Sequence, residues 1–470
     1  MKIVHFSAEC YPFAKAGGLG DVVGALPKYL NQIGHNAAVF LPFYAHIDVS
    51  KKERELRYEN TVSLADGSYP CSVYEVTEEA LGFPLFLVSV EGLTNRDAIY
   101  GYEDDPKRFI AFQRVGLQFL KTQKTLPDII HVHDHHTGLV PFMMTQCPEF
   151  SEFKVIPTLL SIHNAQYQGQ FPHEYGGWLP EFPDSQVGLL DWDGMINPLA
   201  TAIKTAWRVT TVSPSYMKEL QQHANGLESL LAHEAQKCIG ILNGIDAETW
   251  NPQTDPFLET NYGPTNFVTG RRANKEKLCD TYGLSPSLPL FGFIGRLVWE
   301  KGADELVSAL EVALNTLDIN VILLGSGDPA LEKKFEQLSD WYKKNVGAYI
   351  GYKESMSHDV YAAADFLLMP SRVEPCGLNQ LYSFRYGCMP IVRKTGGLKD
   401  TVIDIAQDGL GITHEETTSN QISEAIERAV LFYQQKEAFR KKQRAMMKLD
   451  YSWEHSAKLY ASEYQKLIKS

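Results

Sequence analysis

Strand-like and helix-like stretches alternate along almost the whole chain, and this alternation starts twice. In the first half, short apolar runs are joined by helical stretches such as residues 107–121. In the second half, the pattern restarts at residues 290–294 and continues at residues 320–324. Such alternation is typical of α/β folds with mainly parallel sheets. The strands expected in the first half lie at residues 2–7, 37–41, 128–132, 156–162 and 209–212.

The length of the chain also indicates two domains. At 470 residues it exceeds the roughly 250–300 residues over which one hydrophobic core keeps growing. Residues 246–270 are rich in Asn, Pro, Thr and Gly, which suits an inter-domain linker. We therefore expect a first domain over residues 1–245, a linker over 246–270 and a second domain over 271–448, with a cleft opening at the linker.

Composition excludes several classes of protein. The net charge is −13, and the one basic block, Arg440–Lys442, fits the solvated face of a helix, so nucleic acid is not an expected partner. No apolar run reaches the roughly 18–20 residues that span a bilayer, and Met1 leads straight into a strand without a signal or transit peptide. Seven scattered cysteines without a C-x-x-C pair suit a reducing compartment. We expect a soluble cytoplasmic protein.

Two glycine-bearing turns, Lys15–Asp21 and Glu374–Leu378, each follow an apolar strand and precede a helix. Free backbone N–H groups and the helix dipole at such a turn can bind an anion. A tight strand-to-helix connection also needs glycine for steric reasons alone, so each turn has a structural alternative. Two such turns, carrying a lysine and a glutamate, predict a phosphate held between two lobes.

A pair of cations provides a second route to an anion. Arg296 and Lys301 flank a turn that follows a strand of the buried type. Exposed basic residues are usually just solvated, but the carboxyl end of a parallel strand is where ligands bind in such sheets. Charge-assisted contacts to phosphate are among the stronger hydrogen bonds. They would matter most as negative charge develops on a departing diphosphate.

Two further segments have competing interpretations. His131–His136, with four imidazoles and one carboxylate, could hold a metal, but the turn signal that follows favours a polar strand end lining a cleft. Asp191-Trp-Asp193 has the D-x-D spacing of metal-dependent sugar transferases, yet no strand precedes it, so we interpret it as a loop coincidence. His163, at the end of an apolar run, fits a hydrogen-bonded structural histidine on chemistry alone.

Taken together, the motifs are highly specific and cover nearly the whole length. The chain resembles the bacterial glycogen synthases and plant starch synthases that use ADP-glucose, which are GT-B glycosyltransferases of family 5. The residues that carry the resemblance are Lys15–Val22, His133–Asp134, Ile162–Asn164, Leu242–Asp246, Gly295–Arg296, Lys301–Gly302, Gly351–Tyr352, Pro370–Gln380 and Thr395–Leu398.

The resemblance implies a fold and a reaction. The fold is GT-B, with two facing Rossmann-like domains, an acceptor-side first domain and a nucleotide-sugar second domain, separated by a cleft. The last segment, residues 449–470, would form a helix that crosses back to the first domain. The reaction is a metal-independent, cofactor-free transfer of glucose, with retention of configuration, to the 4-OH at the non-reducing end of an α-1,4-glucan such as glycogen, starch or a maltooligosaccharide.

The resemblance also implies roles for the catalytic candidates. Glu374 would be the acidic residue near the donor glucose, and Arg296 and Lys301 would clamp the diphosphate. Lys15 would contact the donor from the opposite lobe. His163 would act at the reacting sugar through its backbone carbonyl or its ring. The leaving group is already an anion that needs charge stabilisation, which is consistent with cations here and not with the two carboxylates of glycoside hydrolases.

Further residues would bind the nucleotide sugar. Tyr352 would stack on the adenine, and Gly377 and Leu378 would offer backbone N–H groups to phosphate. Asp21 and Asn243 would line the cleft between nucleotide and sugar. The remaining residues expected at the nucleotide sugar are Gly17, Gly18, Asp134, Asn164, Cys376 and Asn379.

The sequence departs from the family pattern in places. Asn379 stands where the family usually has Thr, and Trp299-Glu300 replaces a smaller, polar pair. Tyr382 stands where related sucrose-phosphate and lipid-linked sugar transferases carry a ribose-binding glutamate, which favours a glucan synthase. Two alternatives remain open at this point: another GT-B transferase or epimerase acting on a nucleotide sugar, and a catalytically idle glucan-binding protein.

Overall fold

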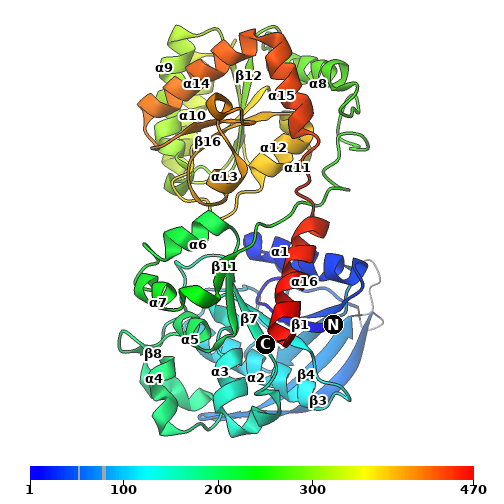
Figure 1. The fold of residues 1–470 in the computed structure, drawn as a ribbon, viewed down its shortest axis with the longest axis vertical. Helices are drawn as coiled ribbons and strands as arrows, with labels where there is room; N and C mark the ends of the chain where they lie inside the picture. The colour runs from blue at the N-terminus through cyan, green and yellow to red at the C-terminus, as the bar shows by residue number, and fades with distance from the viewer. Residues whose placement is uncertain (51–52, 77–80, 470) are drawn as a thin grey trace. The chain divides into compact units, whose positions relative to one another are not determined.

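The computed structural model describes residues 1–50, 53–76 and 81–469, and the chain divides into two compact units. The first unit comprises Met1–Leu242 and the chain from Trp453 onward, and the second comprises Asn243–Ser452 (Figure 1). Each unit has a mainly parallel sheet covered by helices, so the predicted α/β class is confirmed.

The sheet of the first unit has nine strands in the order β11-β10-β7-β6-β1-β2-β5-β4-β3. The predicted strands are present, with bounds that differ by one or two residues at most ends. Seven strands run parallel, and β3 and β4 form an antiparallel edge that the sequence did not suggest. Most of β3 is exposed, so it lacks the apolar run that identified the others. The strands are β1 (Lys2–Phe6), β2 (Asn36–Pro42), β3 (Arg54–Leu64), β4 (Gly67–Val76), β5 (Leu85–Val90), β6 (Ile129–His133), β7 (Thr158–Ile162), β10 (Arg208–Thr211) and β11 (Cys238–Gly240).

Helices of the first unit connect these strands, and a short hairpin of β8 (Asp191–Trp192) and β9 (Met195–Ile196) is separate from the sheet. Asp193, of the D-x-D segment, lies in the tight turn of that hairpin with a positive φ of 56°. The helices are α1 (Gly18–Gln32), α2 (Asp105–Lys121), α3 (Val140–Gln146), α4 (Val187–Leu190), α5 (Pro198–Thr205), α6 (Pro214–Leu220), α7 (Glu228–His233) and α16 (Trp453–Lys469).

The last helix, α16, returns to the first unit, as the resemblance implied (Figure 1). It packs beside α1, and its buried Trp453, Tyr460 and Tyr464 share one apolar cluster with Val22 and Leu26 of that helix. Burying these three aromatic side chains, at roughly 1.5–3 kcal/mol each, helps to hold the 17-residue helix against the first unit.

The second unit has a six-stranded sheet that is parallel throughout, in the order β14-β13-β12-β15-β16-β17. Its strands are β12 (Leu290–Ile294), β13 (Asn320–Gly325), β14 (Val346–Ile350), β15 (Phe366–Met369), β16 (Met389–Arg393) and β17 (Ile412–His414). Its helices are α8 (Phe267–Tyr282), α9 (Ala303–Thr316), α10 (Pro329–Trp341), α11 (Glu354–Ala363), α12 (Asn379–Tyr386), α13 (Gly396–Thr401), α14 (Ser419–Gln434) and α15 (Lys436–Met446).

Residues 246–270, expected to be a linker, belong instead to the second unit. Tyr262 is 1% exposed and donates its hydroxyl to the Tyr386 carbonyl at 2.9 Å. The carboxylate of Asp255 bonds His358 Nδ1 at 2.6 Å, with both side chains buried. Turn-forming residues made this segment look like a linker, but its aromatic and acidic side chains anchor it to the unit.

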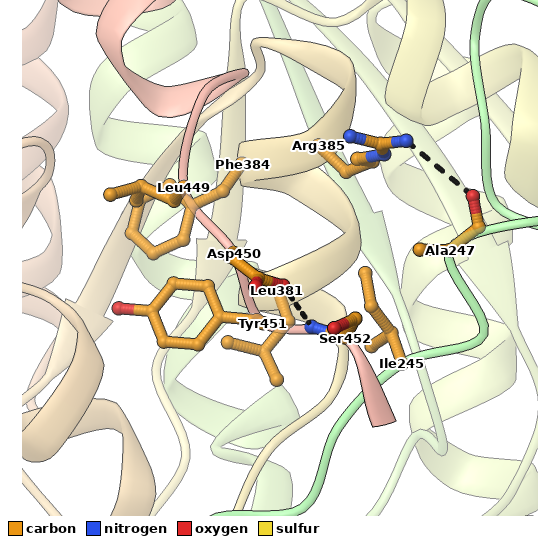
Figure 2. A pocket seen from close by; sticks show the side chains of 9 residues that line it. All are labelled: Ile245, Ala247, Leu381, Phe384, Arg385, Leu449, Asp450, Tyr451 and Ser452. Carbon is orange, nitrogen blue, oxygen red and sulfur yellow. Dashed lines mark hydrogen bonds between the residues drawn. The ribbon is translucent and has the colours of Figure 1, made fainter. Parts of the chain in front are cut away.

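A small pocket lies in the second unit, where its first and last residues run side by side (Figure 2). Ile245 N donates to the Tyr451 carbonyl at 2.8 Å, and Leu381 and Phe384 of α12 form part of the wall. None of the predicted site residues lines this pocket.

None of the helices in the described part of the chain has the length and hydropathy needed to cross a bilayer. All seven cysteines are free.

Candidate active site

Both sheets bring the predicted site residues to the carboxyl ends of parallel strands. In each sheet the strand order reverses beside one central strand: β1 lies between β2 and β6, and β12 lies between β13 and β15. Ligands of open α/β sheets bind in the crevice at such a switch point. In the first unit, the turn after β1 carries Lys15, and the loops after β6 and β7 carry Asp134 and His163. In the second, the loops after β12 and β15 carry Arg296 and Glu374.

The first glycine turn is already filled by a side chain of the protein. Glu9 is 4% exposed, and its Oε2 accepts the backbone N–H groups of Ala16 at 2.7 Å and Gly17 at 2.9 Å. Its Oε1 accepts the Tyr100 hydroxyl at 2.7 Å. The N–H group of Gly17 is therefore bonded to a buried carboxylate in this structure, and the expected place of Gly17 at the nucleotide sugar stays a prediction.

Lys15 and Asp21, at the two ends of this turn, form an ion pair at 2.6 Å. Both side chains are at least one-third exposed, so the pair contributes little to stability. Gly18 begins α1, and no side chain caps that helix. Glu9 was not among the predicted site residues, because nothing near it in the sequence shows that it accepts hydrogen bonds from the turn and from the distant Tyr100.

Asp134 holds the loop after β7. It has a positive φ of 54°, and its Oδ1 accepts the backbone N–H of His163 at 2.7 Å. Burial raises the pKa of the Asp134 carboxyl to about 7, although the N–H groups of His163 and Asn164 oppose that shift. Asn164 is exposed, and its own side chain accepts the Gln166 N–H at 2.9 Å. Asp134 thus fixes the backbone at His163.

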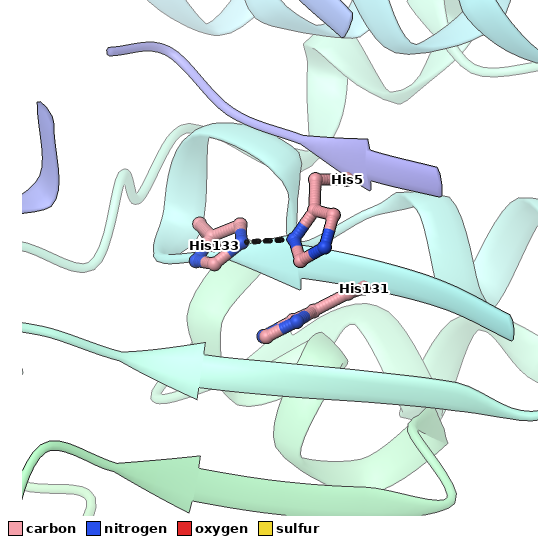
Figure 3. A group of neighbouring side chains, drawn as sticks. All are labelled: His5, His131 and His133. Carbon is pink, nitrogen blue, oxygen red and sulfur yellow. Dashed lines mark hydrogen bonds between the residues drawn. The ribbon is translucent and has the colours of Figure 1, made fainter. Parts of the chain in front are cut away.

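The histidines on β1 and β6 form a buried cluster (Figure 3), and His163, which directly follows β7, contacts it. His5 Nδ1 lies 3.1 Å from His133 Nε2, and His133 Nδ1 lies 3.0 Å from His163 Nε2. Ring nitrogens of His5, His131 and His133 lie within 4.8 Å of one another, so a metal is conceivable there. Both nitrogens of His131 are already hydrogen bonded at 2.7 Å, to Tyr464 and Ser161, which favours a hydrogen-bonded cluster.

In the second unit, the structure brings Lys301 and Glu374 together. Lys301 Nζ lies 2.6 Å from Glu374 Oε2, which also accepts the Ser371 hydroxyl at 3.0 Å. Glu374 is 8% exposed, so the carboxylate is held below the surface and orients the lysine. Arg296 is exposed, and no ion pair joins it to any other residue of the described ranges. This end of the sheet therefore has one oriented and one unpaired cation.

Three glycine positions lock the loops of the second unit against one another. A Cβ on Gly302, where φ is +69°, would lie 2.3 Å from the Pro370 carbonyl oxygen. A Cβ on Gly396 would lie 2.0 Å from the Glu374 carbonyl oxygen, and one on Gly397 would lie 1.9 Å from that of Cys376. Only glycine permits these backbone approaches. The loops that carry Lys301 and Glu374 therefore have fixed positions.

The second glycine turn differs from the first. Gly377 has a φ of +71°, and α12 begins two residues later. Across the described ranges, no hydrogen bond engages the N–H groups of Gly377 or Leu378. Asn379 donates its side-chain N–H to the Ile294 carbonyl at 2.7 Å, which ties the turn to the end of β12. Two N–H groups therefore remain available to an anion at the N-terminus of a helix.

The other predicted residues of the second unit also lie at this end of the sheet. Tyr352 follows β14 and is 82% exposed, so its ring offers a face to a planar group. Asn243 is buried, and its backbone N–H donates to the thiol of Cys376, whose pKa burial raises to about 12. Tyr382 stacks on Trp250 with ring centroids 4.1 Å apart. That ring therefore packs inside the protein.

Two family models match the chain. The starch synthase catalytic domain matches residues 2–233, and glycosyl transferases group 1 matches residues 274–446. The chain is 46% identical over 471 residues to a glycogen synthase of Flavobacterium johnsoniae, with 100% of both covered. It is 38% identical over 494 residues to a glycogen synthase of Thermodesulfovibrio yellowstonii, covering 100% of this chain and 98% of that protein.

Solved structures agree with these matches. The catalytic domain of starch synthase IV from Arabidopsis thaliana, bound to ADP and acarbose, superposes with a TM-score of 0.88 at 33% identity, covering 100% of this chain and 99% of that one. A sucrose-phosphate synthase from Thermosynechococcus elongatus shares the fold, with a TM-score of 0.64 at 18% identity and 99% of both chains covered. The chain has the GT-B fold, is a glucosyltransferase, and belongs to the glycogen synthase and starch synthase family.

Proposed function

We propose that the protein transfers glucose from ADP-glucose to the 4-OH at the non-reducing end of an α-1,4-glucan, with retention of configuration. Glycogen or a maltooligosaccharide would be the acceptor, and the cytoplasm would be the site of action. The observation that carries the proposal is the arrangement of Lys301, Glu374 and Arg296 at the carboxyl ends of β12 and β15.

The chemistry of the leaving group explains this arrangement. When the bond from glucose to ADP breaks, negative charge develops on the diphosphate. Lys301, oriented by Glu374, and the unpaired Arg296 would stabilise that charge, together with the N–H groups of Gly377 and Leu378. A preorganised donor of this kind is worth about 10²–10³ in kcat. Because Lys301 and Arg296 would stabilise the negative charge on the diphosphate, we propose that neither a divalent metal nor a cofactor is required.

Unit 1 would supply the remaining groups. Lys15 lies at the start of the first glycine turn, and His163 sits on a loop whose backbone Asp134 holds. We propose that Lys15 adds a further positive charge at the donor and that His163 contacts the reacting sugar. The exposed ring of Tyr352 would stack on the adenine. Asn379 would act mainly on the turn itself, because its side-chain N–H is bonded to Ile294.

Donor competition tests the proposal. ADP-glucose and UDP-glucose are each offered with maltooligosaccharides, and the released nucleoside diphosphate and the elongated chains are measured with and without EDTA. We expect ADP release and α-1,4 elongation that EDTA does not change. Activity abolished by EDTA and restored by Mg²⁺ or Mn²⁺ would refute the metal-independent step. Transfer to another acceptor, or epimerised donor, would support another GT-B enzyme, and absence of turnover with intact glucan binding would support an idle homologue.

A further inference from the structure

We propose that two buried histidines, His5 and His133, are positioning residues that determine which ring nitrogen of His163 carries the proton. The protonated nitrogen would be Nδ1, so that His163 is a hydrogen-bond donor to a sugar hydroxyl. The assignment of the proton rests on the geometry of the first unit alone. Its consequence for catalysis rests on the proposed function.

The three imidazoles form a continuous chain of contacts. His5 is on β1, His133 is the last residue of β6, and His163 directly follows β7. The distances are 3.1 Å from His5 Nδ1 to His133 Nε2 and 3.0 Å from His133 Nδ1 to His163 Nε2. Because β6 lies between β1 and β7 in the sheet, the strand order itself places the three rings in this sequence.

Burial favours the neutral form of each of the three rings. Burial lowers the pKa of His5 to about 3 and that of His163 to about 3, and it holds the pKa of His133 well below its usual range. A neutral imidazole carries one N–H group and one bare nitrogen. His133 therefore has a single ring proton for its two contacts, which leaves only two ways to place the protons on the three rings.

In the first arrangement, His5 Nδ1–H donates to His133 Nε2, and His133 Nδ1–H donates to His163 Nε2. His163 then carries its proton on Nδ1. In the second arrangement, every donor is reversed: His163 Nε2–H donates to His133, and His133 Nε2–H donates to His5 Nδ1. His5 must then carry its own proton on Nε2.

His5 Nε2 decides between the two. It is buried, and none of the described residues forms a hydrogen bond with it. The second arrangement would therefore bury an N–H group without an acceptor, and orphaned buried N–H groups are rarer than orphaned acceptors. The first arrangement leaves only a bare nitrogen there. It assigns the proton of His163 to Nδ1, which no hydrogen bond engages in the described part of the chain.

His131 lies within this cluster but belongs to a separate network. Thr210 donates its hydroxyl to the Leu160 carbonyl at 3.1 Å and so accepts from Ser161 at 2.7 Å. Ser161 must then accept from His131 Nε2 at 2.7 Å, which leaves His131 Nδ1 to accept the Tyr464 hydroxyl at 2.7 Å. Every proton in this second network is accounted for, so His131 does not determine which nitrogen of His133 carries the proton. The two rings only stack, with centroids 4.1 Å apart.

Nitrogen NMR of the full-length protein, labelled with ¹⁵N at its histidines, tests the assignment directly. Protonated and bare ring nitrogens have distinct shifts, and a His163→Gln variant identifies the His163 signals. We expect Nδ1 of His163 to be protonated in the wild type, and the neutral ring in the His133→Phe variant to be a mixture of the Nδ1–H and Nε2–H tautomers. In the same variant, kcat should fall about 10- to 100-fold while the KM for ADP-glucose changes little. The nucleotide sugar would still bind, but the N–H group of His163 that donates to the sugar hydroxyl would be misplaced.

Two further variants serve as a graded control. His5→Phe keeps the contact between His133 and His163, so a smaller fall in kcat and a smaller change in protonation are expected. Tyr464→Phe removes a buried hydroxyl from the neighbouring network, and it should leave the His163 signals unchanged and kcat within about twofold of the wild type. Near-ultraviolet circular dichroism verifies that each variant is folded.

The proposal is overturned by Nε2 protonation of His163 in the wild type, or by a folded His133→Phe variant with unchanged signals and unchanged kcat. One equivalent of zinc retained after dialysis would also overturn it, since the rings would then be metal ligands. If no glucosyl transfer occurs at all, the proposed function fails, whereas the NMR result still decides the protonation of His163.

Discussion

The two glycine turns look alike in the sequence, but the structure uses them differently. In the first unit, Glu9 accepts the N–H groups of Ala16 and Gly17, so the turn is held by the protein itself. In the second, within the described residues, the N–H groups of Gly377 and Leu378 have no such acceptor. The same strand, turn and helix can thus stabilise a loop or bind an anion. A side chain from outside the motif makes the difference.

The cations of the two units differ in the same way. Lys15 pairs with Asp21 near the surface, where solvent screens the interaction. Lys301 is paired with a carboxylate that is 8% exposed, and Arg296 is unpaired across the described ranges. This comparison supports our proposal that the second unit binds the diphosphate and that the first unit mainly organises the loops around the sugar.

The largest effect is expected for variants that remove a cation of the second unit. Lys301→Ala and Arg296→Ala should each lower kcat by about 10²–10³, because each removes a preorganised positive charge from the departing diphosphate. Steady-state kinetics with ADP-glucose measures this effect. Lys394→Ala is the matched control, since Lys394 also pairs with a glutamate in this unit, at 2.5 Å, but at the surface. An equal loss in Lys15→Ala would remove the distinction between the two units.

Asp134→Asn should stabilise the protein in a pH-dependent manner. The folded-state pKa of about 7 lies above the usual value of 3.8, so between these values the native state binds the extra proton. Stability of the wild type therefore falls as pH rises from about 4 to 7 and then levels off. The asparagine still accepts the His163 N–H without this cost, which gives about 2–4 kcal/mol above pH 7.

Urea unfolding of both proteins across that pH range measures the difference. We expect the curves to separate between pH 4 and 7 and to run parallel at higher pH. A constant difference at all pH values would show that the Asp134 carboxyl has an ordinary pKa. In that case, its hydrogen bonds would outweigh its burial.

Glu9→Ala should destabilise the first unit by about 2 kcal/mol, because two backbone N–H groups and the Tyr100 hydroxyl lose a buried acceptor. Glu9→Gln retains an acceptor oxygen and should recover most of this loss. Glu228→Ala is the matched control: Glu228 also accepts two backbone N–H groups, but from the surface, where water replaces it. Thermal unfolding compares the three, and equal losses for both alanine variants would contradict a special role for Glu9.

The smallest expected effect concerns Asn379, where the resemblance noted in the sequence led us to expect threonine. Asn379→Thr removes the hydrogen bond to the Ile294 carbonyl but leaves the backbone of the turn intact. We expect a loss of about 1 kcal/mol or less and a donor KM close to that of the wild type. A large change in KM with unchanged stability would show that this side chain contacts the donor.

Much of the candidate site could be predicted because its motifs are local. Lys301, Glu374, Lys15 and His163 each stand one short loop beyond a strand whose apolar run is plain in the sequence. Parallel strands bring such loops to one edge of a sheet. The antiparallel edge strand β3 was missed because both its faces are largely polar, and residues 246–270 were assigned to a linker because turn residues outnumber the aromatic side chains that anchor the segment.

The sequence by itself therefore determined the α/β class, the positions of the turns and the residues that could meet a nucleotide sugar, since each depends on neighbours a few positions away. Only the tertiary structure decided which N–H groups, cations and imidazoles already have a partner within the protein. Glu9 and Tyr100 meet across 91 positions, His5 and His133 across 128, and Lys301 and Glu374 across 73. Such pairings depend on strand order and packing. They decide whether an N–H group, a cation or an imidazole is free to act on a ligand.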